Sequence, residues 1–158
     1  MNKYFLATLV ALVSLISNLA FSEIIVDGIL NEKEWGKAQK ITKFYEVYPY
    51  SLEVVEDIKT EILIYEDERG IYFGFKNFQP SSTMRIKNHL RDDEMSITDK
   101  TGVAIDFDGD GINAYQFFIS SSGSIGDATV RNETERNWDW DADWSSASSI
   151  DEDIKNWY

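Results

Sequence analysis

The sequence predicts an all-β fold, an antiparallel β-sandwich of jelly-roll-like type with a short helical turn near the N-terminus. About seven short runs are rich in β-branched and aromatic residues, which favour strands. Turn residues separate these runs at regular spacing, and no long stretch has the apolar periodicity of an amphipathic helix. This combination is typical of two packed antiparallel sheets.

The first elements are a short strand and a helical turn. Residues 23–26 form an apolar, β-branched run that ends at an Asp-Gly turn, and they predict a strand. Asn31 followed by Glu34 is typical of a helix N-cap with a capping acid. We therefore expect one or two helical turns over residues 31–38, with Trp35 pointing inward.

A hairpin is the clearest element of the sequence. Residues 60–65 and 71–75 are β-branched and aromatic runs joined by a polar loop that ends in glycine. Before this hairpin, residues 41–48 alternate loosely and predict another strand. After it, residues 80–100 are polar with little periodicity, so a long connection is expected there.

The C-terminal half predicts three more strands. They fall at residues 102–107, 114–120 and 124–130, and glycines mark the turns between them. Residues 132–143 are polar and rich in tryptophan, which indicates a loop. Residues 144–150 are compatible with a last strand or with a short helix.

The composition restricts the partners of the chain. It has 28 acidic and 15 basic side chains, a formal net charge of −13. Nucleic acids and anionic membrane surfaces would repel such a chain, whereas a neutral ligand or a cation would not. Cysteine is absent, so stability has to come from packing or from a bound metal.

The N-terminal residues predict export. Lys3 precedes an almost unbroken apolar stretch over residues 4–20, and small residues up to Ser22 suit a signal peptidase. We therefore expect a signal peptide at residues 1–22 and a domain at residues 23–158. A permanent membrane anchor is the alternative, and the domain itself is not expected to span a membrane. The expected location is the periplasm, the outer-membrane surface or the extracellular space.

Several motifs together resemble one known family, the family 9 carbohydrate-binding-module-like domains. Such domains stand at the N-terminus of large exported bacterial surface proteins. The motifs are Asp27-Gly28-x-Leu30-x-Glu32-x-x-Trp35, Thr60-Glu61 with Tyr65-x-Asp67, Ile71-Tyr72-Phe73-Gly74-Phe75, Arg91-Asp92, residues 106–117, Ser122-Gly123 with Asp127, and Trp138-x-Trp140-Asp141-x-x-Trp144.

The resemblance implies a β-sandwich that binds an oligo- or polysaccharide without catalysis. The alternative is an accessory domain that packs against the C-terminal remainder of a larger surface protein and binds no sugar. In the family a further strand closes the sandwich. The present sequence therefore looks cut just before that closing strand.

An acidic turn is the candidate metal site. Asp106, Asp108 and Asp110 alternate with other residues before a glycine, as in the first half of a calcium loop. The twelfth position of that loop is Phe117 instead of a glutamate. The family's use of calcium implies that a distant acid such as Asp127 completes the site. The other interpretation is a solvated hairpin turn without a metal.

The tryptophan-rich loop is the candidate sugar site. Trp138 and Trp140 stand beside acidic residues, including Asp141, and sugars stack on aromatic rings while carboxylates bind their hydroxyls. In a strand, Trp138, Trp140 and Trp144 would share one face. The alternative is that these rings belong to the core, which we favour for Trp144.

Two further polar residues, Arg91 and His89, are candidates for a role in binding or catalysis. Arg91, followed by Asp92, could orient a sugar or anchor its loop through an ion pair. His89 is the only histidine, and no serine, cysteine or second histidine stands in motif spacing with it, so a surface position is expected. No enzyme activity is predicted for this chain.

Overall fold

The structure, a computed structural model, describes residues 23–46, 59–93, 97–151 and 156–158. It is all-β, with two antiparallel sheets and one 3₁₀ turn near the N-terminus, which confirms the predicted fold class. The expected signal peptide at residues 1–22 lies outside the described residues. In the part of the chain that is described, no helix is long and apolar enough to cross a membrane.

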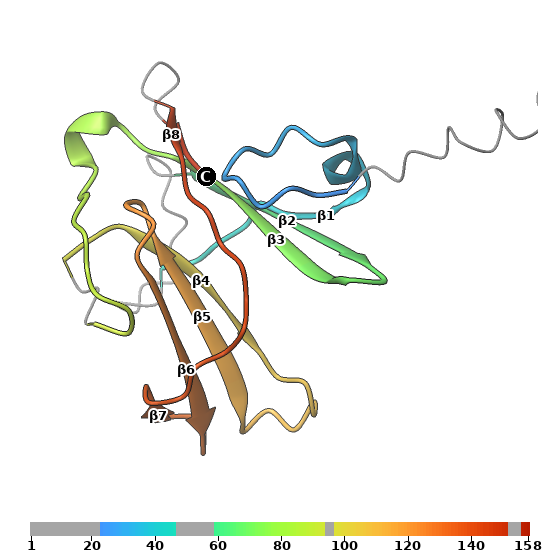
Figure 1. Ribbon diagram of the computed structural model, residues 1–158, viewed down its shortest axis with the longest axis vertical. Helices are drawn as coiled ribbons and strands as arrows, with labels where there is room; N and C mark the ends of the chain where they lie inside the picture. Colours follow the sequence, from blue (N-terminus) through green and yellow to red (C-terminus); the bar gives the residue numbers. More distant parts are fainter. Residues whose placement is uncertain (1–22, 47–58, 94–96, 152–155) are drawn as a thin grey trace, which may run out of the picture.

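The first sheet has five strands (Figure 1). Its strands are β1 (Gln39–Ile41), β2 (Lys59–Asp67), β3 (Gly70–Phe78), β8 (Ile150–Asp151) and β9 (Asn156–Trp157), and the 3₁₀ turn η1 (Lys33–Lys37) precedes β1. Their order in space is β1-β2-β3-β9-β8. The predicted hairpin is its centre, because β2 and β3 pair along their whole length up to the closing pair of Asp67 and Gly70.

The second sheet has four strands whose spatial order follows the sequence. They are β4 (Lys100–Ile105), β5 (Ala114–Ser120), β6 (Ile125–Arg131) and β7 (Glu135–Asn137). The first three correspond to predicted strands, whereas β7 falls within the predicted loop over residues 132–143. Val103, Phe117 and Asp127 stand opposite one another in register, so their side chains share one face. We call this the inner face, because Val103 and Phe117 line a cavity with β3.

The N-terminal segment differs from the prediction, because residues 23–26 form no strand. The carboxylate of Glu32 accepts the backbone N–H of Ile25 and the indole N–H of Trp35, both at 2.9 Å. The segment is thereby held by a side chain instead of by a neighbouring strand. The predicted Asn31 cap is also wrong, since Glu32 occupies the cap position of η1 and makes no side-chain cap bond.

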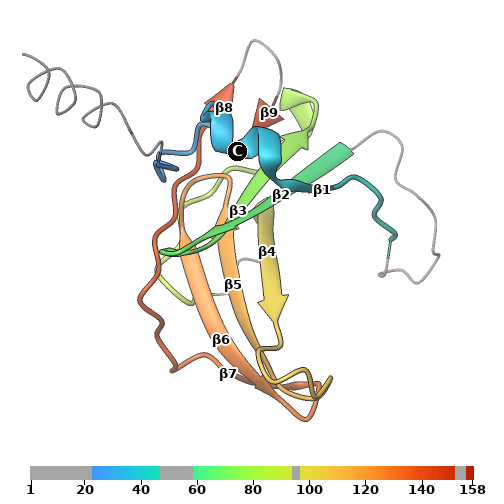
Figure 2. The same ribbon diagram turned by 90° about the vertical axis from the view of Figure 1, so that its right-hand side faces the viewer.

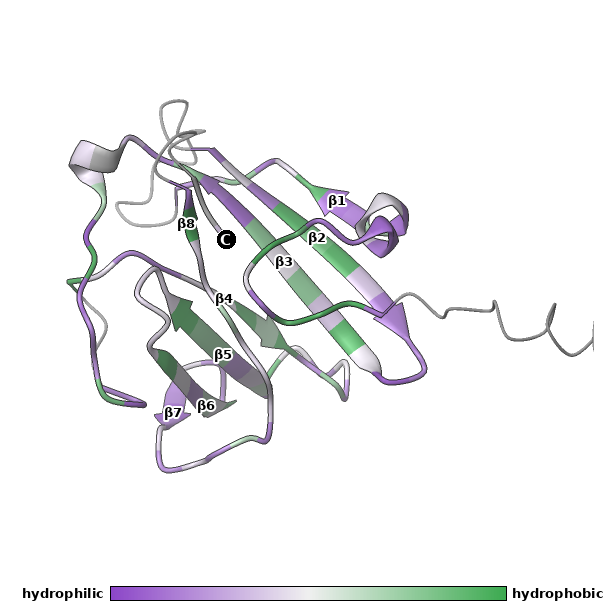
Figure 3. Ribbon diagram, turned by 45° about the horizontal axis from the view of Figure 1, so that its top comes forward, coloured by the Kyte–Doolittle hydropathy of each residue, from purple (hydrophilic) through white to green (hydrophobic). Residues whose placement is uncertain are grey.

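The main buried hydrophobic cluster lies on the side of the first sheet that faces away from the second. Trp35 points inward as predicted and packs with Ile24 and Leu63. Gly74 of β3 permits this close approach, because a Cβ there would lie 3.0 Å from the methyl carbons of Leu30 and 3.1 Å from the Trp35 ring. Figure 3 shows the apolar residues concentrated along the strands and the polar residues at the turns.

Two other predicted strands are shortened or absent. In the range 41–48, β1 contributes only its last residue, residues 42–46 are irregular, and the remainder lies outside the described residues. Residues 144–149 form neither a strand nor a helix. The side chains of Trp144, Ser148 and Ser149 bond to other elements instead, and these distant contacts explain why the local sequence does not decide the conformation.

Residues 138–149 form an irregular strap that runs from β7 along one side of both sheets to β8 (Figure 2). The Ser148 hydroxyl donates to the carbonyl of Ser121 at 3.0 Å, and the Ser149 hydroxyl donates to that of Gly28 at 2.6 Å. Gly28 has a φ of 83°, and a Cβ there would lie 2.9 Å from the carbonyl carbon of Ser148. These contacts take the place of strand pairing and connect the strap to both halves of the fold.

Candidate functional site

A row of aromatic rings lies on the inner face of the second sheet. The ring centroid of Phe107 is 5.6 Å from that of Tyr115, which is 5.1 Å from that of Trp140. Trp140 is 6.1 Å from Phe117, and Phe117 is 5.4 Å from Trp144. All four contacts are tilted or edge-on, as aromatic pairs prefer. The row is therefore continuous from the β4–β5 turn to the strap.

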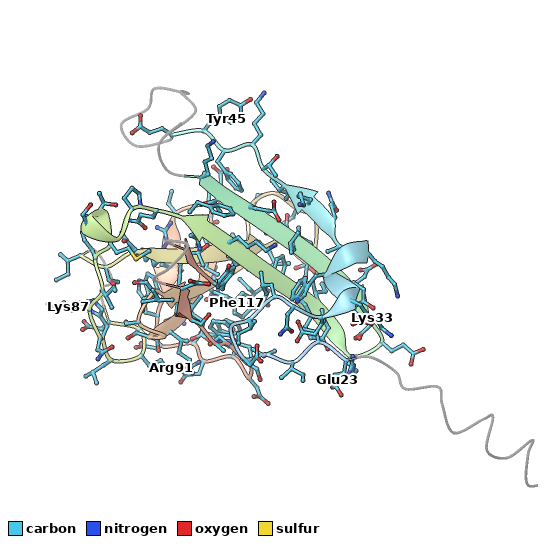
Figure 4. All side chains as sticks on the ribbon, turned by 90° about the horizontal axis from the view of Figure 1, so that it is seen from above. Glu23, Lys33, Tyr45, Lys87, Arg91 and Phe117 are labelled. Carbon is cyan, nitrogen blue, oxygen red and sulfur yellow. The ribbon has the colours of Figure 1, made fainter. Side chains whose placement is uncertain are left out.

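One end of this row is open to solvent. Phe107 is 63% exposed, Tyr115 is 36% exposed, and Trp140 is half-buried. Phe117 is also half-buried, and it lies near the middle of the molecule in Figure 4. The exposed surface of the row is thus at the β4–β5 turn, and its other end enters the interior.

Trp138 does not belong to this row. Its ring centroid lies 6.0 Å from Phe118, the neighbour of Phe117 in β5, and adjacent strand residues point to opposite faces. Trp138 is 43% exposed, as expected for a loop residue. Trp138 therefore does not share a face with Trp140 and Trp144, as it would in a strand, because these residues follow an irregular strap.

A buried carboxylate closes the inner end of the row. The side chain of Asp127 is fully buried, and its Oδ2 accepts the indole N–H of Trp144 and the backbone N–H of Ala142, each at 2.9 Å. Nη2 of Arg91 donates to both Asp127 oxygens, at 2.8 and 3.0 Å. These bonds compensate a buried charge that would otherwise be costly, and they attach the strap to β6.

Arg91 connects this buried carboxylate to two others, of which Asp92 is half-buried and Asp141 is exposed. Its Nε lies 2.8 Å from Oδ1 of Asp141 and 3.4 Å from Oδ2 of Asp92. Burial of the guanidinium lowers the pKa of Arg91, but the charge and hydrogen bond of Asp127, with the charges of the other two carboxylates, outweigh burial and raise that pKa. The side chain of Asp141 is 70% exposed, so the cluster reaches the surface, and Figure 4 places Arg91 toward the edge of the molecule.

The predicted acidic turn directs its carboxylates onto its own backbone. Asp106 accepts the N–H groups of Asp108 at 3.1 Å and of Gly109 and Gly111 at 2.7 Å. Asp110 accepts two further N–H groups later in the turn. The bond from Gly111 is the largest cause that lowers the pKa of Asp106, and backbone N–H groups likewise lower that of Asp110. The turn is thus stabilised by hydrogen bonds of its own, and calcium at this turn stays a prediction.

A different acidic group has the spacing of a metal site. One carboxylate oxygen from each of Asp92, Asp127 and Asp141 lies within 4.8 Å of the others, and these oxygens could hold a metal ion. Of the four predicted metal ligands, Asp127 is the one that belongs to this group; the other three are in the acidic turn. The guanidinium of Arg91 pairs with the same three carboxylates. A metal ion and Arg91 would therefore compete for one place.

Some features of this region were not predicted. The side chain of His89 is only 5% exposed instead of lying at the surface, and its Nε2 is buried without a hydrogen-bond partner among the described residues. The contributions of Phe107, Tyr115 and Phe117 to the row were also missed. The alternation of aromatic residues along β5 was the available signal for two of them.

Comparison of the chain with models of protein families, with curated proteins and with solved structures finds no match. The case for a function therefore rests on the geometry described above. Three of the four predicted ligand-binding residues lie together, because Arg91 pairs with Asp141, and Asp141 follows Trp140 in the strap. The fourth, Trp138, lies on the other face of the sheet.

Proposed function

We propose that this chain is a non-catalytic carbohydrate-binding domain of an exported bacterial protein, with its sugar site on the open end of the aromatic row. The observation that carries the proposal is the row of rings from Phe107 through Tyr115 to Trp140, whose outer end is exposed. Asp141 directly follows Trp140 in the strap and pairs with Arg91. The resemblance of the motifs to family 9 carbohydrate-binding-module-like domains agrees with it.

The chemistry of this surface suits a neutral oligo- or polysaccharide. The C–H groups of a pyranose ring pack against an aromatic face. Tyr115 and Trp140 offer two neighbouring rings, whose centroids lie 5.1 Å apart. Hydroxyl groups form stronger hydrogen bonds with ionised partners than with neutral ones. Asp141 can accept from them and Arg91 can donate to them, so the site combines stacking with charge-assisted bonds.

Calcium is the metal that we propose for this domain, in a structural role. Calcium prefers oxygen ligands, and carboxylates of Asp92, Asp127 and Asp141 supply only oxygen. These residues would hold the ion after the Arg91 guanidinium had moved aside. The carboxylates of Asp106, Asp108 and Asp110 remain the second candidate set.

The test is a titration of intrinsic tryptophan fluorescence with a panel of plant and bacterial oligosaccharides, with calcium present and then chelated. We expect a saturable change that Trp140→Ala abolishes. Trp138→Ala is the matched control, since it removes an exposed tryptophan from the same strap on the opposite face of the sheet. Equal loss in both variants, or no response to any sugar from the folded protein, would contradict the proposed site.

A further inference from the structure

The outer face of the second sheet, opposite the inner face, carries charged and aromatic side chains of its own. The register from β4 to β7 places Lys100, Gln116, Phe118 and Arg136 on this face. The other paired residues on it are glycine, alanine, serine or valine, so none of them is acidic. Two cations thus share one face of a chain whose formal net charge is −13.

Two aromatic rings form a platform on the outer face. Gly102 stands opposite Phe118, and a Cβ at Gly102 would lie 2.6 Å from the Phe118 ring, so that ring leans over the glycine. The Trp138 ring centroid lies 6.0 Å from that of Phe118, with an angle of 32° between the ring planes. Because Trp138 is 43% exposed, its ring offers an apolar surface to a ligand.

The polar groups beside this platform are hydrogen-bond donors. Nε of Arg136 donates to Oε1 of Gln116 at 3.0 Å, which leaves the amide N–H groups of Gln116 and the other guanidinium N–H groups for a ligand. Nζ of Lys100 lies 5.6 Å from the centre of the Phe118 ring. The ion pairs of the described residues involve other basic side chains than Lys100 and Arg136.

Donors around an aromatic surface favour a ligand that combines carboxylates with apolar C–H groups. A guanidinium binds a carboxylate through two parallel N–H···O bonds, and the C–H groups of a pyranose pack against an aromatic ring. A peptide fits less well, because its backbone N–H groups need acceptors that these side chains do not offer.

The net charge limits how many charges the ligand carries. A nucleic acid has a phosphate at every nucleotide, and a chain of net charge −13 repels it. A short saccharide with few carboxylates is affected less, since physiological salt screens charges beyond about 8 Å. The cations on the outer face then contribute more than the distant acids.

We propose that the outer face binds a saccharide that contains a uronic acid residue. The pyranose ring packs on Trp138, and its carboxylate accepts hydrogen bonds from Arg136 and Gln116. Lys100, which approaches Phe118 from β4, attracts a second carboxylate of the same saccharide. This site is independent of the proposed site at the open end of the aromatic row, which takes a neutral sugar.

Tri-galacturonic acid is the probe for this site. Its methyl ester is the matched control, because the ester keeps the sugar rings and removes the charges. Tri-glutamate is the second control, because it has carboxylates without sugar rings. NMR of the indole N–H groups of the complete protein, at about 0.15 M salt, reports binding. We expect a saturable shift of the Trp138 signal and an affinity for the acid at least about tenfold above that for either control.

A pair of variants tests the contact with the carboxylate. Arg136→Gln removes the proposed donor, and Arg131→Gln is its matched control, since both remove one positive charge. Arg131 is exposed, and it follows Val130 of the outer face, so it belongs to the opposite face. We expect Arg136→Gln to weaken tri-galacturonic acid by at least about tenfold and Arg131→Gln to leave its affinity unchanged. Circular dichroism establishes that both variants are folded.

Three results would overturn the proposal. The first is a Trp138 signal that stays in place at millimolar tri-galacturonic acid. The second is an affinity for the methyl ester or for tri-glutamate equal to that for the acid. The third is equal weakening in Arg136→Gln and Arg131→Gln, which would reduce the interaction to unspecific attraction. Neutral sugars are expected to act on Trp140 and not on Trp138, so failure of one site is distinguished from failure of the other.

Discussion

Replacement of Asp127 by alanine is the perturbation whose effect the structure defines most sharply. The carboxylate is fully buried and accepts bonds from Arg91, from the indole of Trp144 and from the backbone of Ala142. The variant leaves these donors without their shared acceptor and releases the strap from β6. Removing one partner of a buried ion pair costs about 3–5 kcal/mol.

Urea unfolding followed by tryptophan fluorescence measures this loss. With a denaturant dependence of about 2 kcal/mol/M, a loss of about 4 kcal/mol lowers the unfolding midpoint by about 2 M. Asp127→Asn should lose less, because its amide oxygen still accepts one or two of the bonds. The control is Asp141→Ala, which removes the other main partner of Arg91 from a side chain that is 70% exposed.

Asp141→Ala should lower the free energy of unfolding by no more than about 1 kcal/mol, which is the usual contribution of an exposed ion pair. Equal losses in Asp127→Ala and Asp141→Ala would refute the reasoning, since burial would then not distinguish the two carboxylates. A loss below about 1 kcal/mol for Asp127→Ala would refute it as well, because it falls short of the lower limit for a buried pair.

Three other predictions concern packing, pH and metal. Gly74→Ala forces a Cβ to 3.0 Å from Leu30 and should destabilise the fold by about 1–3 kcal/mol, whereas Gly36→Ala, with nothing within 4 Å, should not; thermal unfolding checks both. The lowered pKa of Asp106 means that its stabilisation is present above its ordinary pKa of about 4 and is lost as pH falls through the folded value. Carbon-detected NMR titration should find that folded value below the ordinary one, and an unshifted value would contradict the turn geometry. Arg91→Gln should raise the affinity for calcium, measured by calorimetry, because it removes the guanidinium that competes with the ion for the carboxylates. Weaker calcium binding by the variant than by the unaltered protein would contradict this competition.

The elements that were predicted well are those whose conformation follows from strand propensity and from the turns beside them. The β2–β3 hairpin and strands β4 to β6 combine β-branched or aromatic runs with turn residues, so strand propensity and the turns agree. The predicted strand over residues 23–26 failed because a distant side chain, Glu32, takes the N–H of Ile25. The pattern of residues 23–26 alone does not predict that bond.

The candidate site was only partly predictable for a similar reason. Tryptophan beside acidic residues in a polar loop indicated Trp140 and Asp141 as candidates, and Arg91 was a residue that could orient a ligand or anchor its loop. In the structure Arg91 pairs with Asp141, which follows Trp140. The sequence could not separate Trp138 from Trp140, because that separation depends on the strap, which Asp127 holds at Ala142 and Trp144. Tertiary hydrogen bonds, and not local propensity, place these rings.

The central claim is that sugar binds at the open end of the aromatic row, and NMR of the indole N–H groups tests it most directly. The isotope-labelled protein is titrated with an oligosaccharide that alters its fluorescence, and the indole signals are assigned by single Trp→Phe variants. The account predicts that the signal of Trp140 moves with saturable dependence on sugar, while those of Trp35 and Trp138 stay in place. A shift confined to Trp138, or the same small shift at all three indoles, would contradict a site on the inner face of the second sheet.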